Sequence, residues 1–423
     1  MRKNQQLASD IVLSVLSGES LTARFSALWR AHPDLAGADR GTIQDLSYGT
    51  LRYLTELQAY AAFMTSKPIA DERVNALLWV SLYQLIHTRN APHAVVNEAV
   101  NAAQETGRPW AKALVNALLR RFLREQKTLK ARIPWPEEAF YSYPSWWIQR
   151  LKRDHPQDYA QILAEGNRHP PMTLRVNRRK HTQESYLEKL TELGIAATPA
   201  GSVGLVLTQP VAVERLPGFA QGWTSVQDYG AQLVPALLDL KEGMRICDAC
   251  CAPGGKTAHL LEAAAVHVTA LDASAERLVR VRENLGRLGL DASLKVADAA
   301  DLSAWWDGEP YDAVLLDAPC SASGVVRRHP DSKWLRRDQD VAQYAREQNR
   351  LLEALWRVVK PGGKLLYVTC SVFNAENEEV IVPFCERTHD AHLAPGSFPL
   401  DTAGRWIPSA HNDGFFYALL HKA

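Results

Sequence analysis

The sequence of 423 residues has no apolar run long enough to cross a bilayer, so no transmembrane helix is expected. Its basic start, Met1-Arg2-Lys3, resembles the first part of a secretory signal, but polar residues stand where that signal needs an apolar core. The six cysteines are too few for a disulfide scaffold in a chain of this length. We therefore expect a cytoplasmic protein without a membrane segment.

A complete set of metal ligands is also missing. Cys247 and Cys250 have the Cys-x-x-Cys spacing of a zinc clip, and Cys251 follows directly. No second pair and no nearby histidine supplies the remaining ligands of a tetrahedral site. We therefore expect no metal site.

The chain has almost no net charge, with a formal value of +1, but its cations are unevenly distributed. Residues 108–132 hold eight Lys and Arg residues and a single acid, Glu125. A second cluster, Arg178-Arg179-Lys180, falls in a predicted turn. The first cluster alone also suits a solvated helix face, but two clusters favour nucleic acid, because neutralising phosphates requires several cations.

The length favours two to three domains, and the first of them is helical. Leu7, Ile11 and Val15 recur every fourth residue, and a similar apolar stripe occupies residues 74–85. Because no strand pattern occurs here, we predict an all-α domain of five to seven helices over residues 1–132. It resembles the NusB fold, a small RNA-binding helical domain.

Residues 133–225 are predicted to form a linker and a small α+β domain. Pro134 and Pro136 interrupt the helical pattern. A predicted strand over residues 172–176 precedes a helix that Gly194 closes, and short strands follow around Ile195 and at residues 205–207.

From residue 226 to residue 423, predicted strands and helices alternate, which is typical of a doubly wound parallel sheet in a Rossmann-like α/β domain. A last apolar run, residues 415–420, is predicted to be an antiparallel edge strand. The parallel strands are expected at the apolar runs 244–249, 266–271, 293–296, 311–316 and 364–369.

Two cysteines and an aspartate stand where predicted parallel strands end. Asp317 and Cys320 follow the fourth strand, and Cys370 follows the fifth. Ligands bind outside the carboxyl ends of such strands, so we expect these side chains at one site. Most buried cysteines are inert, but two thiols beside a carboxylate indicate covalent chemistry.

The turn after the first parallel strand opens a helix, and Asp272 ends the second strand, where an acid can bind ribose hydroxyls. A P-loop would need a glycine where Cys250 stands, and the Gly-x-Gly-x-x-Gly pattern of dinucleotide enzymes is absent. S-adenosylmethionine has a ribose and no phosphate, so it is the cofactor that fits best. The turn itself reads Cys250-Cys251-Ala252-Pro253-Gly254-Gly255-Lys256.

This set of groups suits methylation of cytosine at C5. That carbon is a poor nucleophile until a thiolate adds to C6, which makes C5 enamine-like and able to accept a methyl group. Asp317 can hold the N3/N4 edge of the base and favour protonation at N3, which stabilises the charge that develops there. The base must leave its stack, since both of its faces are used.

Three motifs resemble those of the RNA cytosine-C5 methyltransferases, and the resemblance extends over the whole chain. By this resemblance Cys370 is the nucleophile, Cys320 assists release of the methylated RNA, and Asp317 and Lys256 belong to the same catalytic group. The substrate implied is small-subunit ribosomal RNA, and we expect a monomer. The motifs are Asp248-x-Cys250-x-Ala252-Pro253-Gly254-Gly255-Lys256-Thr257, Asp317-Ala318-Pro319-Cys320 and Thr369-Cys370-Ser371.

The resemblance also implies a set of cofactor contacts. Asp272 would bind the ribose, Asp298 the adenine side, and the turn from Cys250 to Lys256 the methionine end, with Asp317 close by. Asp301 is an alternative to Asp298, although spacing favours Asp298. Cys251 stands where the family usually has alanine, a small difference in volume.

Two other functions remain open. A DNA cytosine methyltransferase would use Cys320 as nucleophile and would need neither a second cysteine nor the helical front domain. An RNA-binding adaptor with an inactive methyltransferase fold would be expected to lose a motif residue, yet Lys256, Asp317, Cys320 and Cys370 are all present.

Overall fold

The computed structural model describes residues 2–105, 107–394 and 404–423, and contacts divide the chain into two units. The helical unit comprises Met1–Arg168 and Val326–Asp338, and the sheet unit comprises His169–Val325 and Gln339–Ala423. The three-domain division at residues 132 and 225 stays a prediction. By their contacts, residues 133–168 belong to the helical unit and residues 169–225 to the sheet unit.

The helical unit confirms the all-α prediction for the N-terminal part, since its described residues form helices and no strand. Seven of these helices lie within residues 2–132, at the upper end of the predicted number. The helices of the unit are α1 (Arg2–Leu16), α2 (Leu21–Ala31), α3 (Gly37–Arg52), α4 (Leu54–Met64), α5 (Glu72–His87), α6 (Pro92–Glu105), α7 (Ala111–Arg132), α8 (Glu137–Tyr141), α9 (Ser145–Asp154), α10 (Tyr159–Gly166) and α16 (Ser332–Leu335).

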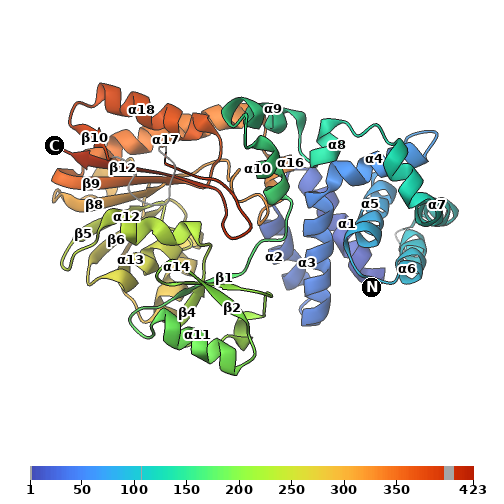
Figure 1. Cartoon of the computed structure of the whole chain (residues 1–423), viewed down its shortest axis with the longest axis horizontal. Helices are drawn as coiled ribbons and strands as arrows, with labels where there is room; N and C mark the ends of the chain where they lie inside the picture. The colour runs from blue at the N-terminus through green and yellow to red at the C-terminus, as the bar shows by residue number, and fades with distance from the viewer. Residues whose placement is uncertain (1, 106, 395–403) are drawn as a thin grey trace. The chain divides into compact units, whose positions relative to one another are not determined.

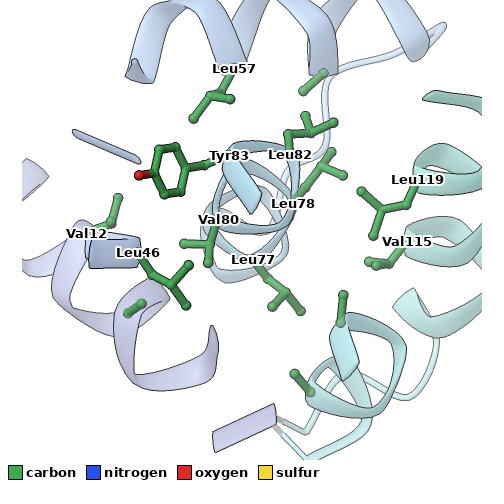
Figure 2. Close-up of a cluster of buried hydrophobic side chains, with 14 of the residues drawn as sticks. Val12, Leu46, Leu57, Leu77, Leu78, Val80, Leu82, Tyr83, Val115 and Leu119 are labelled. Carbon is green, nitrogen blue, oxygen red and sulfur yellow. The ribbon is translucent and has the colours of Figure 1, made fainter. Parts of the chain in front are cut away.

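Helix α5 is the centre of this unit. Its apolar side chains point in several directions, and α1, α3, α4, α6 and α7 surround it (Figure 2). The sequence predicts one apolar stripe over residues 74–85, but buried side chains occupy several sides of α5, as in a helix that packs in the centre of a domain. Gly49 of α3 allows the ring of Tyr83 on α5 to pack directly against the α3 backbone, because a Cβ at Gly49 would lie 1.8 Å from Cζ of Tyr83.

A segment distant in sequence, residues 326–338, completes the helical unit. The side chain of Lys333 is fully buried, and its ammonium donates to the carbonyls of Arg52 (2.7 Å) and Ser142 (2.8 Å) and to Oδ1 of Asn167 (2.8 Å). Asp331 accepts a hydrogen bond from the backbone N–H of Leu21 at 3.0 Å. The chain therefore leaves the sheet unit directly after the loop that carries Cys320, packs among helices, and returns.

The sheet unit contains a small antiparallel sheet of order β2-β3-β1-β4, in keeping with the predicted α+β region. Arg175 of β1 is fully buried and forms an ion pair with Glu262 at 2.8 Å. Its guanidinium also donates to the carbonyl of Gly255 at 2.7 Å, so this sheet supports the predicted cofactor turn. The elements here are β1 (Thr173–Val176), α11 (Gln183–Glu192), β2 (Ala197–Ala200), β3 (Gly204–Leu207), η1 (Val213–Arg215) and β4 (Thr224–Val226).

The large sheet has the order β10-β12-β9-β8-β5-β6-β7, with β11 paired to β12. Strands β5 to β9 are parallel to one another, and β12 is antiparallel to β9. The strands are β5 (Arg245–Ala249), β6 (His267–Asp272), β7 (Ser293–Val296), β8 (Tyr311–Asp317), β9 (Val359–Thr369), β10 (Ala391–Leu393), β11 (Arg405–Trp406) and β12 (Phe415–Lys422).

Helices cover both faces of this sheet, which explains the unbroken apolar runs of its strands. In β8, Val314 and Leu316 pack in the core beside α17 and α18, while Ala313 and Leu315 pack in the core beside α13 and α14 (Figure 1). The Rossmann-like prediction is confirmed. The remaining elements are η2 (Gly230–Leu233), α12 (Val234–Leu238), α13 (Gly255–Ala263), α14 (Ala275–Leu288), α15 (Leu302–Trp305), α17 (Asp338–Trp356), η3 (Asn374–Glu376) and α18 (Glu378–Arg387).

The prediction that residues 415–420 form an edge strand is wrong. Strand β12 is antiparallel as expected, but β10 pairs with its outer side. At three residues, β10 is too short to show the alternation that identifies a strand in sequence.

Candidate active site

The two predicted reactive thiols lie side by side. Cys320 follows β8, Cys370 follows β9, and these strands are parallel neighbours that pair Asp317 with Val368. Their carboxyl ends therefore meet at one edge of the sheet, and the two Sγ atoms are 3.3 Å apart. The hydrogen bond between the thiols, followed by burial, raises the pKa of Cys320 well above its usual range.

Asp317 and Lys256 form an ion pair beside the thiols. Lys256 lies in the first turn of α13, and its Nζ is 2.6 Å from Oδ2 of Asp317. Burial lowers the pKa of Lys256, but the Asp317 carboxylate outweighs it, and the net shift is upward. The ammonium is therefore charged, and it fixes one oxygen of the carboxylate at the strand end.

A cavity of about 390 Å³ opens at this edge of the sheet and is called the cofactor cavity below. Seven of the residues predicted for the site line it, and they come from the ends of β5, β6, β7, β8 and β9. These residues are Cys250, Ala252, Asp272, Asp298, Asp317, Cys320 and Cys370.

The other predicted cofactor residues, Cys251, Pro253, Gly254, Gly255 and Lys256, are not among the residues that line this cavity. Cys251 is buried in the core, and its N–H donates to the carbonyl of Leu271 at 2.8 Å. Gly254 has a φ of +92°, in the left-handed region that favours glycine. These residues shape the turn that places Cys250 and Ala252 at the cavity wall, and a direct contact with the cofactor stays a prediction.

Asp272 is held firmly at the end of β6. Its Oδ1 accepts from the N–H of Ser274 at 2.9 Å, and its Oδ2 accepts from the N–H of Ala252 at 3.3 Å. Arg277 adds an ion pair at 3.2 Å. A carboxylate oriented in this way, with its residue lining a cavity, suits a pair of ribose hydroxyls.

Asp298 is more open than Asp272, with a side chain about half exposed. Its Oδ2 is 2.9 Å from Nη2 of Arg350. Partial burial raises the pKa of Asp298, but its hydrogen bonds with Arg350 and with the N–H of Ala300 prevail and lower it. The alternative acid, Asp301, accepts from Ser303 at 2.7 Å and is not among the cavity residues, so the geometry favours Asp298.

Sequence reasoning missed three charged residues of the cavity wall: Arg277, Glu347 and Arg350. Glu347 and Arg350 are three residues apart on α17 and form an ion pair at 2.6 Å. Their spacing is visible in the sequence, but any exposed helix face offers such pairs, so it did not indicate a site.

The cavity suits an adenosine-bearing cofactor without phosphate. Asp272 and Asp298 offer acceptors for hydroxyl and amino groups, and the apolar side chains of Pro319 and Leu351 offer a surface for a planar base. Among the described residues, no group of His, Cys, Asp and Glu side chains is arranged to hold a metal ion, and no helix is long and apolar enough to span a membrane.

Three family models match consecutive parts of the chain. The NusB family matches residues 2–124, a ferredoxin-like domain of RsmF/B-like methyltransferases matches residues 143–214, and the 16S rRNA methyltransferase RsmB/F family matches residues 235–421. Together they cover the helical front, strands β1 to β3 of the small sheet and the Rossmann-like sheet.

Relatives extend the similarity along the chain. Ribosomal RNA small subunit methyltransferase B of Pseudomonas putida is 48% identical over 91% of both chains, and that of Serratia proteamaculans is 42% identical over 100% of both. The solved structure of PH0851 is similar over 99% of both chains, with 26% identity and a TM-score of 0.78. A methyltransferase homologue from Pyrococcus horikoshii covers 68% of this chain and 97% of its own, with 28% identity and a TM-score of 0.58. The chain therefore belongs to the RsmB/F family of 16S rRNA methyltransferases.

Proposed function

We propose that the protein methylates C5 of a cytosine in small-subunit ribosomal RNA through a covalent bond between Sγ of Cys370 and C6 of the base. The family gives the activity itself, S-adenosylmethionine-dependent RNA cytosine-C5 methylation. The observation that supports the covalent step is the pair of thiols 3.3 Å apart beside the Asp317–Lys256 ion pair, at the wall of the cofactor cavity. When bound there, S-adenosylmethionine supplies an electrophilic methyl group.

In this proposal Cys370 acts as a thiolate that attacks C6, and the electrons of the C5–C6 double bond move toward C5 and N3. Asp317 holds the N3/N4 edge of the base and favours protonation of N3, and Lys256 keeps the carboxylate oriented. A proton taken up at N3 from solvent neutralises the charge that develops there, and C5 becomes an enamine-like carbon that can take the methyl group.

Release requires loss of the C5 proton and cleavage of the bond between Cys370 and C6. Cys320 is the neighbouring sulfur, at 3.3 Å from Cys370. Once Cys370 is bonded to C6, the thiol–thiol hydrogen bond that contributes most to the raised pKa of Cys320 is gone. We assign the Cys320 thiolate the removal of the C5 proton, directly or through water, after which the electron pair restores the C5–C6 double bond and expels the Cys370 thiolate. The two thiols thus act in sequence, one in attack and one in elimination.

The function is tested by incubating the protein with small-subunit ribosomal RNA and S-adenosylmethionine carrying a labelled methyl group. We expect label in RNA, and mass mapping should locate it as 5-methylcytosine. RNA from cells that already contain the active protein is the matched control, because its target should be occupied. Equal labelling of DNA, or label outside cytosine, would contradict the proposal.

The ribose role of Asp272 gives a binding prediction. Asp272→Ala should weaken S-adenosylmethionine binding by about 1.5–3 kcal/mol, because a charge-assisted hydrogen bond is lost. Calorimetry on the folded variant measures this, and Asp301→Ala is the control, since that carboxylate does not line the cavity. Unchanged affinity in Asp272→Ala would contradict the assignment.

We also propose that the exposed face of α7 binds RNA. Arg108 pairs with Asp71 at 2.6 Å and Arg121 pairs with Glu125 at 3.0 Å, so these two cations are already engaged within the protein. The exposed cations on the helix are Arg120, Arg124, Lys127, Lys130 and Arg132.

Removing charge from this face should flatten the salt dependence of RNA binding. For Arg120, Arg124 and Lys127 changed together to Gln, the slope of log affinity against log salt should fall by about one unit per lost phosphate contact. Lys241→Gln, at the amino-terminal side of β5, should leave the slope unchanged. The same slope in the triple variant as in the wild type would show that this face meets only solvent.

We further infer that the protein acts as a monomer in the cytoplasm. All six cysteines are free thiols, which suits a reducing compartment. Sedimentation at concentrations that support activity should give a single species near 47.1 kDa. A dimer as the active species would contradict the monomer.

A further inference from the structure

A fully buried carboxylate, Glu376, lies between the two thiol-bearing loops. It belongs to η3, just after β9, and it takes no part in the chemistry described above. Its Oε2 accepts hydrogen bonds from the hydroxyls of Ser321 (2.5 Å) and Ser371 (2.6 Å). These serines directly follow Cys320 and Cys370, so one carboxylate oxygen joins the residues next to both thiols.

The second oxygen of Glu376 holds the Cys320 loop from its other side. Oε1 accepts from the backbone N–H of Ser321 at 2.8 Å and from Nε2 of Gln348 at 3.2 Å. The same Gln348 nitrogen donates to the carbonyl of Pro319 at 2.9 Å. Glu376 and Gln348 therefore fix the backbone on both sides of Cys320.

Further bonds join the two loops directly. Ser323 and Ser371 are hydrogen-bonded through their hydroxyls at 2.9 Å, and the N–H of Gly324 donates to the carbonyl of Cys370 at 2.8 Å. The hydroxyl of Tyr367 donates to the backbone carbonyl of Glu376 at 2.6 Å and anchors η3 to β9. Glu376 is thus held from its own backbone as well as from its side chain.

Among the residues that the structure describes, the four groups that donate to the Glu376 carboxylate are neutral. Burial raises its pKa, and the hydrogen bonds from Ser321, Ser371 and Gln348 act in the opposite direction. A buried acid costs stability, and these hydrogen bonds offset part of that cost. They also tie the carboxylate to the residues that directly follow both thiols.

We propose that Glu376 is a positioning residue, which holds the Cys320 and Cys370 loops at the separation that sequential attack and elimination require. The consequence for catalysis rests on the proposed function, but the spacing of the thiols can be measured without it. Displacement of a reacting group by about 1 Å can reduce a rate about 100-fold. Loss of the hydrogen bonds between Glu376 and the two loops should therefore lower kcat.

Two substitutions separate the effect of the Glu376 hydrogen bonds from the effect of its carboxylate charge. Glu376→Ala removes all four acceptor contacts. In Glu376→Gln the carbonyl oxygen can still accept from Ser321 and Gln348, and the amide can donate to the two serine hydroxyl oxygens. Glu379→Ala is the control, because Glu379 is an exposed carboxylate three residues along the chain.

The first measurement is the rate at which diamide converts Cys320 and Cys370 into a disulfide. The two thiols lose two electrons and two protons, and diamide takes up both to become a hydrazine. Mass spectrometry of the linked peptides distinguishes this pair from the other four cysteines. We expect a rate at least about tenfold lower in Glu376→Ala and within about threefold of wild type in Glu376→Gln and Glu379→Ala.

The second measurement is steady-state methyl transfer. Glu376→Ala should lose about 100-fold in kcat with little change in KM for S-adenosylmethionine, and Glu376→Gln should recover most of kcat. If Glu376→Ala does not fold, the Ser321→Ala/Ser371→Ala double variant takes its place, with the same expected slowing of disulfide formation. The positioning role would be overturned by a wild-type rate of disulfide formation in Glu376→Ala or in the double variant. It would also be overturned if Glu376→Gln and Glu376→Ala lowered that rate equally. Failure of the wild-type protein to transfer methyl groups to RNA would contradict the proposed function and leave the disulfide rates to decide the role of Glu376.

Discussion

Cys370→Ala is expected to abolish methyl transfer, with a fall in kcat on the order of 10⁴-fold or more, because C5 stays unreactive without addition at C6. The variant should also form no covalent protein–RNA adduct. Incubation with S-adenosylmethionine and small-subunit ribosomal RNA, followed by denaturing electrophoresis and counting of transferred methyl groups, measures both effects.

Two controls make this result specific. Cys385→Ala removes a thiol that lies on α18 and is not among the cavity residues, so it should retain activity. Calorimetry should give the same S-adenosylmethionine affinity for Cys370→Ala as for wild type, since the proposed role of Cys370 is toward the base. An adduct formed by Cys370→Ala would assign the nucleophile to another residue.

The parallel sheet was predictable because its strands are buried on both faces. In β8 every residue from Ala313 to Leu316 packs into one core or the other, and this produces a continuous apolar run that needs no tertiary information to recognise. Once the strands are known, topology brings Asp317, Cys320 and Cys370 to one edge. The position of the cavity thus followed from local patterns, while the roles of these residues stay predictions.

The rest of the site depends on contacts between segments far apart in the sequence. Arg350 of α17 meets Asp298 across 52 positions, and Glu376 meets Ser321 across 55. Neither pairing produces a periodic pattern in the sequence, because these hydrogen bonds depend on the tertiary fold. The same reason hides the passage of residues 326–338 into the helical unit, where Lys333 is buried against backbone carbonyls.

The edge of the sheet and the cofactor turn each have a structural feature that the sequence pattern does not reveal. Strand β12 has the clear apolar pattern of a strand, but whether it lies at an edge depends on the short strand β10. In the turn, the structure adds a backbone role to two predicted cofactor residues: Gly254 has a left-handed conformation, and the carbonyl of Gly255 accepts a hydrogen bond from Arg175. Their contact with the cofactor stays a prediction.

Cys320→Ala is expected to have the opposite effect on the adduct from Cys370→Ala. If Cys320 acts only in elimination, its loss leaves the attack of Cys370 and the methyl transfer intact but stops the reaction before release. Protein and RNA should then accumulate as a covalent complex that survives denaturing electrophoresis, and turnover should stop after about one methyl group per protein.

The double variant Cys320→Ala/Cys370→Ala decides which sulfur forms the bond. It should give no adduct, because the complex trapped by Cys320→Ala requires the Cys370 thiolate. An enzyme of the DNA cytosine type, with Cys320 as nucleophile, would show the reverse: Cys320→Ala free of adduct and Cys370→Ala still active. Since the two Sγ atoms are only 3.3 Å apart, position alone does not separate these mechanisms. The presence or absence of the adduct in each of the three variants separates the two mechanisms. An adduct that persists in the double variant would contradict both Cys370 and Cys320 as the nucleophile.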